Sequence, residues 1–211
     1  MANARNLSTL AQGASTAGIL GGTYGGTGAS LSPTTAGNVL FTADGSVWSS
    51  TQKIVQGTSV ATTSGTSVAF TGLPSWIKRI TMMLNGVSLS GTSYIQIQLG
   101  TSGGFVTSGY SSGVAALTSA GAGLGAAAVT TGFYTTGSNT QTNTASGVYF
   151  ISNLSGNIWT YAGTGVRTGD VATYFNSAAP LSLGGVLTQI RISSGNGTDT
   201  FDAGSVNILY E

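Results

Sequence analysis

Apolar and polar residues alternate in several short stretches from about residue 51 onward. The clearest stretch sets Ile95, Ile97 and Leu99 against Gln96 and Gln98. Successive side chains of a strand point to opposite faces, so this alternation predicts a half-buried strand. The same period recurs in four further stretches, whose apolar members are Ile80/Met82/Leu84, Val148/Phe150, Ile190/Ile192 and Val206/Ile208/Tyr210.

Glycine-rich breaks separate these stretches. They include Gly103-Gly104, the segment 121–125 and the turn-like segment 194–197. Many short strands joined by such breaks are typical of antiparallel sandwiches, and nothing after residue 51 has the spacing of a helix. We therefore expect an all-β head domain over residues 51–211, an antiparallel β-sandwich of jelly-roll type.

Residues 1–50 have a different character. Their glycine run, 21–28, cannot form the interior of a helix, where each glycine costs about 1 kcal/mol. The run also has too few side chains to build a core, and glycines of this kind suit close approach between backbones. The sequence therefore predicts an extended, glycine-rich N-terminal segment that needs a partner to become ordered.

Composition and charge narrow the classes of function. The chain has no His and no Cys, and its net charge is +1. An imidazole base, a reactive thiolate and a Cys/His zinc site are therefore excluded. A chain without a basic cluster lacks the charge that binding to nucleic acid requires, and no apolar run has the roughly 18 residues of a membrane span. We expect no cofactor, no nucleic-acid partner and no insertion into membranes.

The aspartates are the one enzymatic option, because glycoside hydrolysis needs only two carboxyl groups. Asp199 and Asp202 lie three residues apart, which in a strand places them on opposite faces. The segment 202–204 equally fits a bulge or tight turn whose carboxylate bonds local amides. Asp170, after Gly169, fits a hairpin turn. We expect a protein that is not an enzyme, with a small glycan depolymerase as the less favoured alternative.

Aromatic residues supply the candidate receptor-binding positions. Tyr110 lies in a Gly/Ser-rich segment, and Trp159 and Tyr161 share one face of a predicted strand. Aromatic rings that are exposed stack on the apolar side of sugar rings, whereas buried ones pack in a core or an interface. Lys78 and Arg79 begin a predicted strand, where we expect an ion pair at a sheet edge or between subunits.

Three segments carry a recurring pattern. The first runs from Gly25-Gly26-Thr27-Gly28 through Gly37-Asn38-Val39-Leu40 to Asp44-Gly45 and Trp48. The second is 70–80, with the letters FTGLPSWIKRI, and the third is 201–210, with the letters FDAGSVNILY. Together they resemble the virion fibre proteins of bacteriophage tails, in which a GGTG step precedes a fibre or head domain.

The resemblance implies a homotrimer on the tail or capsid surface of a virion, made in the cytoplasm of a bacterial host. Residues 1–50 would attach it to other virion proteins and form the trimer, and residues 51–211 would present a head that binds a host surface glycan or protein. No catalytic motif is implied. The chain has no extended shaft, so a short tail fibre, a capsid decoration or head fibre, and an adaptor-like piece all stay open. A bacterial adhesin is disfavoured because no export signal is evident.

Overall fold

The computed structural model describes residues 38–42, 48–52, 54–118, 121–125, 129–136, 142–169 and 172–211. The chain divides into two compact units, Met1–Val55 and Gln56–Glu211. In the first unit, β1 (Asn38–Thr42) and β2 (Trp48–Gln52) form an antiparallel pair. Residues 1–37, which include the predicted glycine-rich segment, lie outside the described residues.

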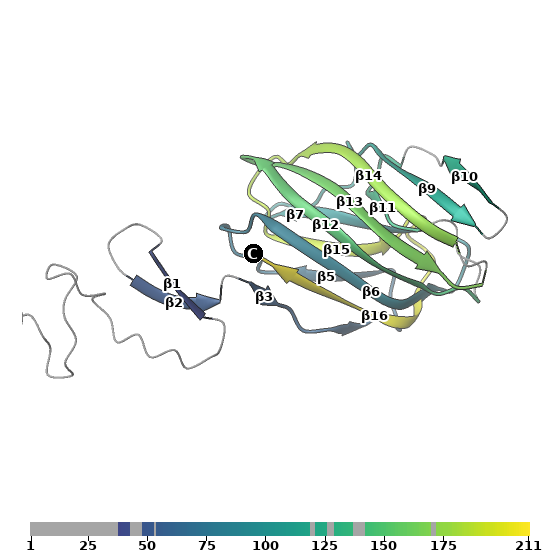
Figure 1. The fold of residues 1–211 in the computed structure, drawn as a ribbon, viewed down its shortest axis with the longest axis horizontal. Coiled ribbons are helices and arrows are strands. Elements are labelled where there is room, and N and C mark those ends of the chain that lie inside the picture. The colour runs from purple at the N-terminus through teal and green to yellow at the C-terminus, as the bar shows by residue number, and fades with distance from the viewer. Residues whose placement is uncertain are drawn as a thin grey trace, which may run out of the picture. The chain divides into compact units, whose positions relative to one another are not determined.

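The second unit is an antiparallel all-β fold, with no helix among the residues that the structure describes (Figure 1). Its larger sheet has the order β10-β9-β14-β13-β12-β6-β16-β3, and β4 also pairs with β16. These strands are β10 (Gly121–Gly125), β9 (Ser112–Thr118), β14 (Ala172–Ser182), β13 (Ile158–Arg167), β12 (Ala145–Ser155), β6 (Arg79–Leu89), β16 (Phe201–Tyr210), β3 (Val55–Gln56) and β4 (Val60–Ala61).

The smaller sheet has the order β11-β7-β15-β5, with β8 paired to β7. Its strands are β11 (Phe133–Tyr134), β7 (Ile95–Thr101), β15 (Gln189–Ser194), β5 (Ser67–Thr71) and β8 (Gly104–Phe105). Inward residues of both sheets share one core, so the predicted antiparallel β-sandwich is confirmed. The jelly-roll order is not, because β12, β13 and β14 follow one another as a simple meander.

The alternating stretches form the expected strands. Ile80, Met82 and Leu84 of β6 point into the core, as do the isoleucines of β15. In β12 the strand is correct, but Val148 and Phe150 lie on the exposed face while the residues between and after them are buried.

β7 is not half-buried as predicted. Six consecutive residues, from Ile95 through residue 100, are buried, so Gln96 and Gln98 are as inaccessible as the isoleucines beside them. The reason is that polar groups from β15 and from Thr131 cover the outer side of this strand. A polar side chain that finds hydrogen-bond partners can be buried without large cost.

Four aromatic rings form a column that connects the two sheets. Tyr149 of β12 stacks beside Tyr161 of β13 with centroids 6.2 Å apart. Tyr161 stacks on Phe133 of β11 at 4.7 Å, and Phe133 meets the edge of Tyr110 at 4.9 Å. Stacked and edge-to-face pairs of this kind add roughly 0.5–1.5 kcal/mol each beyond the area they bury. The column therefore fixes β11 against the larger sheet.

Glycines make room for the column. A Cβ atom at Gly163 would lie 2.5 Å from Cδ1 of Tyr149 and 2.9 Å from the carbonyl oxygen of Val148. Gly147 and Gly165 also lie against the Tyr149 hydroxyl. The glycines of β12 and β13 therefore form a shallow bed for one tyrosine ring, a requirement that strand propensity alone would oppose.

Strands distant in sequence complete each sheet. β15 lies between β7 and β5, and β16 lies beside β6. Arg79 at the start of β6 forms an ion pair with Glu211, whose carbonyl accepts from the backbone N–H groups of Lys78 and Arg79. The ion pair expected at an edge or between subunits is thus found within one chain, on an interior strand.

We expect Gly163→Ala to lower the free energy of unfolding by ~1–3 kcal/mol, because the added methyl group overpacks the Tyr149 ring and its backbone. Gly184→Ala is the control, since it has no atom within 4 Å of the added Cβ and needs no left-handed conformation. Chemical denaturation of both variants measures the difference. Equal stabilities would contradict the packing described for Tyr149.

Candidate functional site

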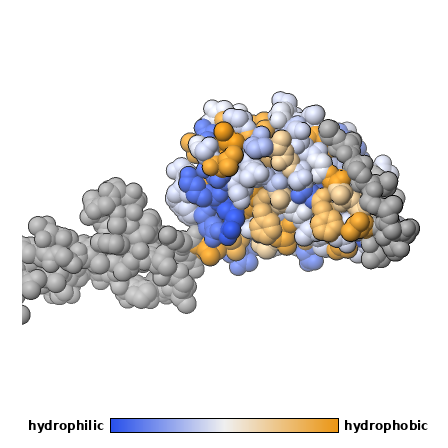
Figure 2. Space-filling view, turned by 45° about the horizontal axis from the view of Figure 1, so that its top comes forward, coloured by the Kyte–Doolittle hydropathy of each residue, from blue (hydrophilic) through white to orange (hydrophobic). Residues whose placement is uncertain are grey.

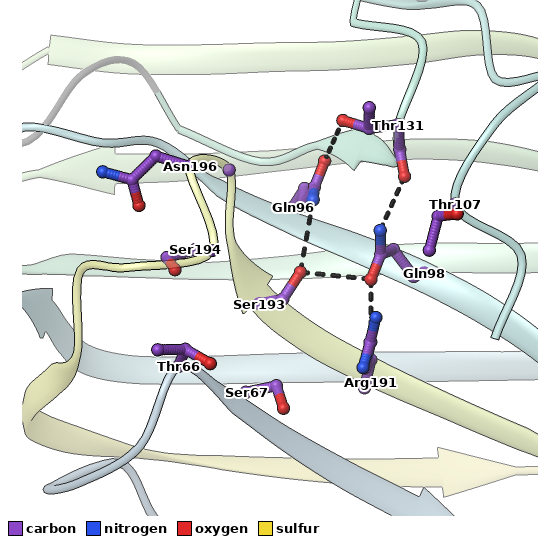
Figure 3. A pocket seen from close by; sticks show the side chains of 12 residues that line it. Thr66, Ser67, Gln96, Gln98, Thr107, Thr131, Arg191, Ser193, Ser194 and Asn196 are labelled. Carbon is purple, nitrogen blue, oxygen red and sulfur yellow. Dashed lines mark hydrogen bonds between the residues drawn. The ribbon is translucent and has the colours of Figure 1, made fainter.

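A polar pocket lies on the outer side of the smaller sheet (Figure 3). Its volume is about 260 Å³, close to the lower end of the roughly 300–1,000 Å³ found for small-molecule sites. Every lining residue is polar or glycine: Thr66, Ser67, Gln96, Gln98, Thr107, Thr131, Arg191, Ser193, Ser194, Gly195, Asn196 and Gly197. The pocket therefore offers amides, hydroxyls and one guanidinium, with no carboxylate in its lining.

Gln98 is the centre of the pocket's hydrogen-bond network. Its Oε1 accepts from Nε of Arg191 at 2.7 Å and from Oγ of Ser193 at 3.3 Å. Its Nε2 donates to the carbonyl oxygen of Thr131 at 2.7 Å. Since both ends of the amide are engaged, its orientation is fixed before any ligand arrives.

Gln96 extends the network along β7. Its Oε1 accepts from the Thr131 hydroxyl at 2.8 Å, and its Nε2 donates to Ser193 at 3.3 Å. Figure 3 shows these bonds running from Thr131 through Gln96, Ser193 and Gln98 to Arg191. A Cβ at Gly132 would lie 2.7 Å from Oε1 of Gln96, so a glycine is what lets this segment close over the glutamines.

Arg191 is the charged member of the pocket lining. Its guanidinium carbon lies 4.3 Å from the centre of the Phe105 ring, so the ring and the Gln98 amide together hold its plane. Partial burial lowers the pKa of this guanidinium from its ordinary value, and the nearby Tyr110 acts in the opposite direction. Nη1 and Nη2 have no hydrogen-bond or ion-pair partner in the described part of the chain.

Ser194, at the end of β15, adds a second unsatisfied group to the lining. The residue is almost completely buried, and its Oγ has no hydrogen-bond partner among the described residues. Buried hydroxyl groups normally have a hydrogen-bond partner, so an unpartnered one is unusual in a protein interior. The pocket thus contains polar groups that its own network does not use.

The three predicted receptor-binding aromatics lie in the core. Tyr110, Trp159 and Tyr161 are only 3%, 4% and 2% exposed. The faces of Tyr161 lie between Phe133 and Tyr149. Stacking on a sugar requires an exposed ring face, so the prediction is wrong for all three. The alternation that places Trp159 and Tyr161 on one face of β13 places them on its inner face.

Two of these tyrosines instead position the pocket. The Tyr161 hydroxyl donates to the carbonyl oxygen of Tyr134 at 2.6 Å, and Nδ2 of Asn176 donates to the same oxygen at 2.9 Å. The Tyr110 hydroxyl accepts from the backbone N–H of Leu99 at 2.8 Å. Gln96 and Gln98 belong to β7, and Thr131 comes just before β11, so these bonds hold both parts of the pocket lining in place.

Trp159 borders a second hollow of about 190 Å³, lined also by Ser75, Ile77, Lys78, Asn153, Gly156, Asn157, Val186 and Leu187. Its Nε1 has no hydrogen-bond partner among the described residues. The hollow mixes apolar and polar residues and has no network comparable to that of Gln98 in the described chain. It is the weaker of the two candidates.

The aspartates have structural partners. Oδ2 of Asp199 accepts from the backbone N–H of Ser93 at 3.0 Å, and the side chain of Asn196 and this N–H group lower the pKa of Asp199. A general acid in glycoside hydrolysis needs a raised pKa, so the shift has the wrong sign for that role. Asp202 accepts from the Ser88 hydroxyl.

The bulge alternative for the segment 202–204 is the one found. The register of β16 against β6 shifts on both sides of Ala203, and Gly204 has a φ of 91°. Asp170 lies outside the described residues, although Arg167 and Ala172 on either side of it pair as a hairpin requires. No group of three or more potential metal ligands occurs in the described residues, and these residues include no helix that could cross a membrane.

No protein-family model, curated protein or solved structure matches this chain.

The buried tyrosines generate a prediction for alkaline pH. Burial raises the pKa of Tyr110 and of Tyr134 to about 12, from an ordinary value of 10, and raises the pKa of Tyr149 and Tyr161 as well. The contribution of these neutral phenols to the free energy of unfolding is therefore fully present below pH 10. It is lost as the pH rises from 10 through about 12, because the unfolded chain ionises first.

We expect the circular dichroism signal of the strands to disappear within this window. A late phase of phenolate absorbance should change with it, because the buried hydroxyls ionise only when the aromatic column opens. Complete ionisation of all tyrosines with the strands intact would contradict the role assigned to these rings.

Proposed function

We propose that this chain is a bacteriophage virion fibre protein whose β-sandwich head binds a host surface glycan without hydrolysing it. The observation that carries the proposal is the chemistry of the pocket: amides, hydroxyls and one guanidinium in a fixed network. Sugars are recognised by such donors and acceptors, whereas hydrolysis needs two suitably spaced carboxyl groups that this lining lacks.

Two of the three segments that resemble phage fibres, 70–80 and 201–210, are neighbours in the fold, which supports the same proposal. The segment 70–80 leads into β6, and the segment 201–210 is β16, its partner strand. The rings of Trp76 and Tyr210 lie 6.0 Å apart, and Ile80 pairs with Tyr210. The two segments therefore form one structural unit of the head.

The outer face of the larger sheet supports assembly with other copies. Outward positions of β9, β14, β13, β12, β6 and β16 form three adjacent rows: Leu117/Thr173/Val166/Ser146, Ala115/Phe175/Thr164/Val148/Met83/Asn207 and Gly113/Ser177/Ala162/Phe150/Thr81/Leu209. None of these described positions carries a charge. Figure 2 shows orange groups separated mainly by pale residues, with the largest blue group at the left of the head.

A second copy of the chain is the partner that fits this face. Phe150 and Phe175 are 45% and 49% exposed. Large apolar side chains that are exposed together on one uncharged face commonly mark a surface for protein–protein contact. A face without charge meets other copies of itself without like-charge repulsion, and three such faces around a threefold axis cover one another. A trimer would also present three pockets, so weak binding at each would combine into strong attachment.

We expect light scattering after size exclusion to give the mass of a trimer for the full-length protein. Phe175→Asp should weaken the trimer at least tenfold, since it would bury a charge between subunits. Val186→Asp is the control: Val186 is equally exposed, at 48%, but follows β14 outside the three rows. A monomer in the wild-type protein, or equal effects of both variants, would contradict the proposed interface.

We expect the full-length protein to bind purified bacterial surface polysaccharides on a glycan array without reducing their viscosity in solution. Thr107→Trp should reduce binding at least tenfold, because the large indole would fill the pocket. Thr107 is exposed at the pocket and lies outside its hydrogen-bond network, so the substitution should leave that network intact. Ser102→Trp, at an exposed position outside the pocket lining, should bind normally. Binding that is insensitive to Thr107→Trp would place the glycan site elsewhere, and falling viscosity would favour a depolymerase.

A further inference from the structure

We propose that the pocket selects a sugar that bears an anionic group, a carboxylate or a phosphate, and that Arg191 binds this group. The proposal rests on the glycan-binding function above and specifies that the bound sugar is negatively charged. It depends on how Arg191 is held, on which of its nitrogens stay unused, and on the lack of a counter-ion among the described residues.

The geometry leaves one edge of the guanidinium available. Nε is used by Oε1 of Gln98 at 2.7 Å, and one face of the group is covered by the Phe105 ring at 4.3 Å. Nη1 and Nη2 have no partner in the described chain, and Arg191 lines the pocket. Two parallel N–H groups on a planar cation match the two oxygens of a carboxylate or phosphate.

The charge of Arg191 is not balanced by the described part of the protein. Each described acid has another partner: Asp199 accepts from Ser93, Asp202 accepts from Ser88, and Glu211 pairs with Arg79. A half-buried cation without a counter-ion loses hydration and gains no ion-pair attraction in return. An anionic ligand would supply that attraction, and the uncharged remainder of the lining would not oppose it.

Uncharged groups of the pocket fit the remainder of a sugar. The side chains of Ser67, Thr107 and Asn196 line it, and the Oγ of Ser194 has no partner in the described chain. Hydroxyls and amides of this kind both donate and accept, as sugar hydroxyls do. The division of roles is therefore a charged contact at Arg191 and neutral hydrogen bonds around it.

The test uses the full-length protein and calorimetric titration with a panel of methyl hexuronides, the matched neutral methyl hexosides, and hexose 6-phosphates. We expect at least one anionic sugar to bind ten or more times more tightly than its neutral counterpart. Increasing the salt concentration should weaken this sugar and leave the neutral one unchanged. Whether the uronide or the phosphate binds more tightly identifies the anionic group.

Arg191→Gln should reduce the anionic sugar to the affinity of the neutral one, and Arg191→Lys should retain part of the preference because it keeps the charge without the paired N–H groups. Arg79→Gln removes the same charge outside the pocket and should have no effect. The salt dependence of the wild-type protein tests the proposal even if the Arg191 variants do not fold.

Equal binding of matched neutral and anionic sugars would overturn the inference and leave the glycan-binding function intact. A preference for anionic sugars that survives in Arg191→Gln would overturn the role of Arg191. Absence of binding by every member of the panel to the wild-type protein would overturn both the inference and the assignment of this pocket.

Discussion

The head depends on holding one short segment, residues 131–135, against both sheets at once. Phe133 enters the core between Tyr110 and Tyr161, and the carbonyl of Tyr134 accepts from two side chains of the larger sheet. Immediately before them, Thr131 and Gly132 close over the glutamines of β7. The apolar column and the polar pocket are therefore two sides of the same segment, and disturbing the first displaces the second.

The polar side chains at the base of the pocket are as buried and as well ordered by contacts as those of a hydrophobic core. Its glutamines are buried, and each side-chain amide forms hydrogen bonds both to β15 and to Thr131. Such a network keeps its shape without a ligand, which reduces the ordering that binding would otherwise require. A chain rich in small polar residues can form a selective site in this way with very few charges.

The sequence pattern was sufficient for the class of fold, because period-two alternation reports directly which residues face a core. It was insufficient for the site. Alternation places Gln96 and Gln98 on the face of β7 opposite the isoleucines. It does not indicate whether water or other polar side chains cover that face. It also groups Trp159 with Tyr161 without saying whether that face is inside. The pocket depends on Gln98 lying opposite Arg191, a pairing between residues 93 positions apart that no local pattern encodes.

The place of β15 has a consequence for how the protein folds during synthesis. β5 and β7 lie in one sheet only through β15, so this part of the sheet cannot form until β15 has been synthesised. β6 likewise pairs with β16, which is synthesised more than a hundred residues later. Pairings this distant are slow, because loop closure comes before any compensating contact. While they wait, β5 and β7 have open backbone edges of the kind that capture neighbouring chains. Translation speed and the crowding of nascent chains should therefore affect the yield of folded protein.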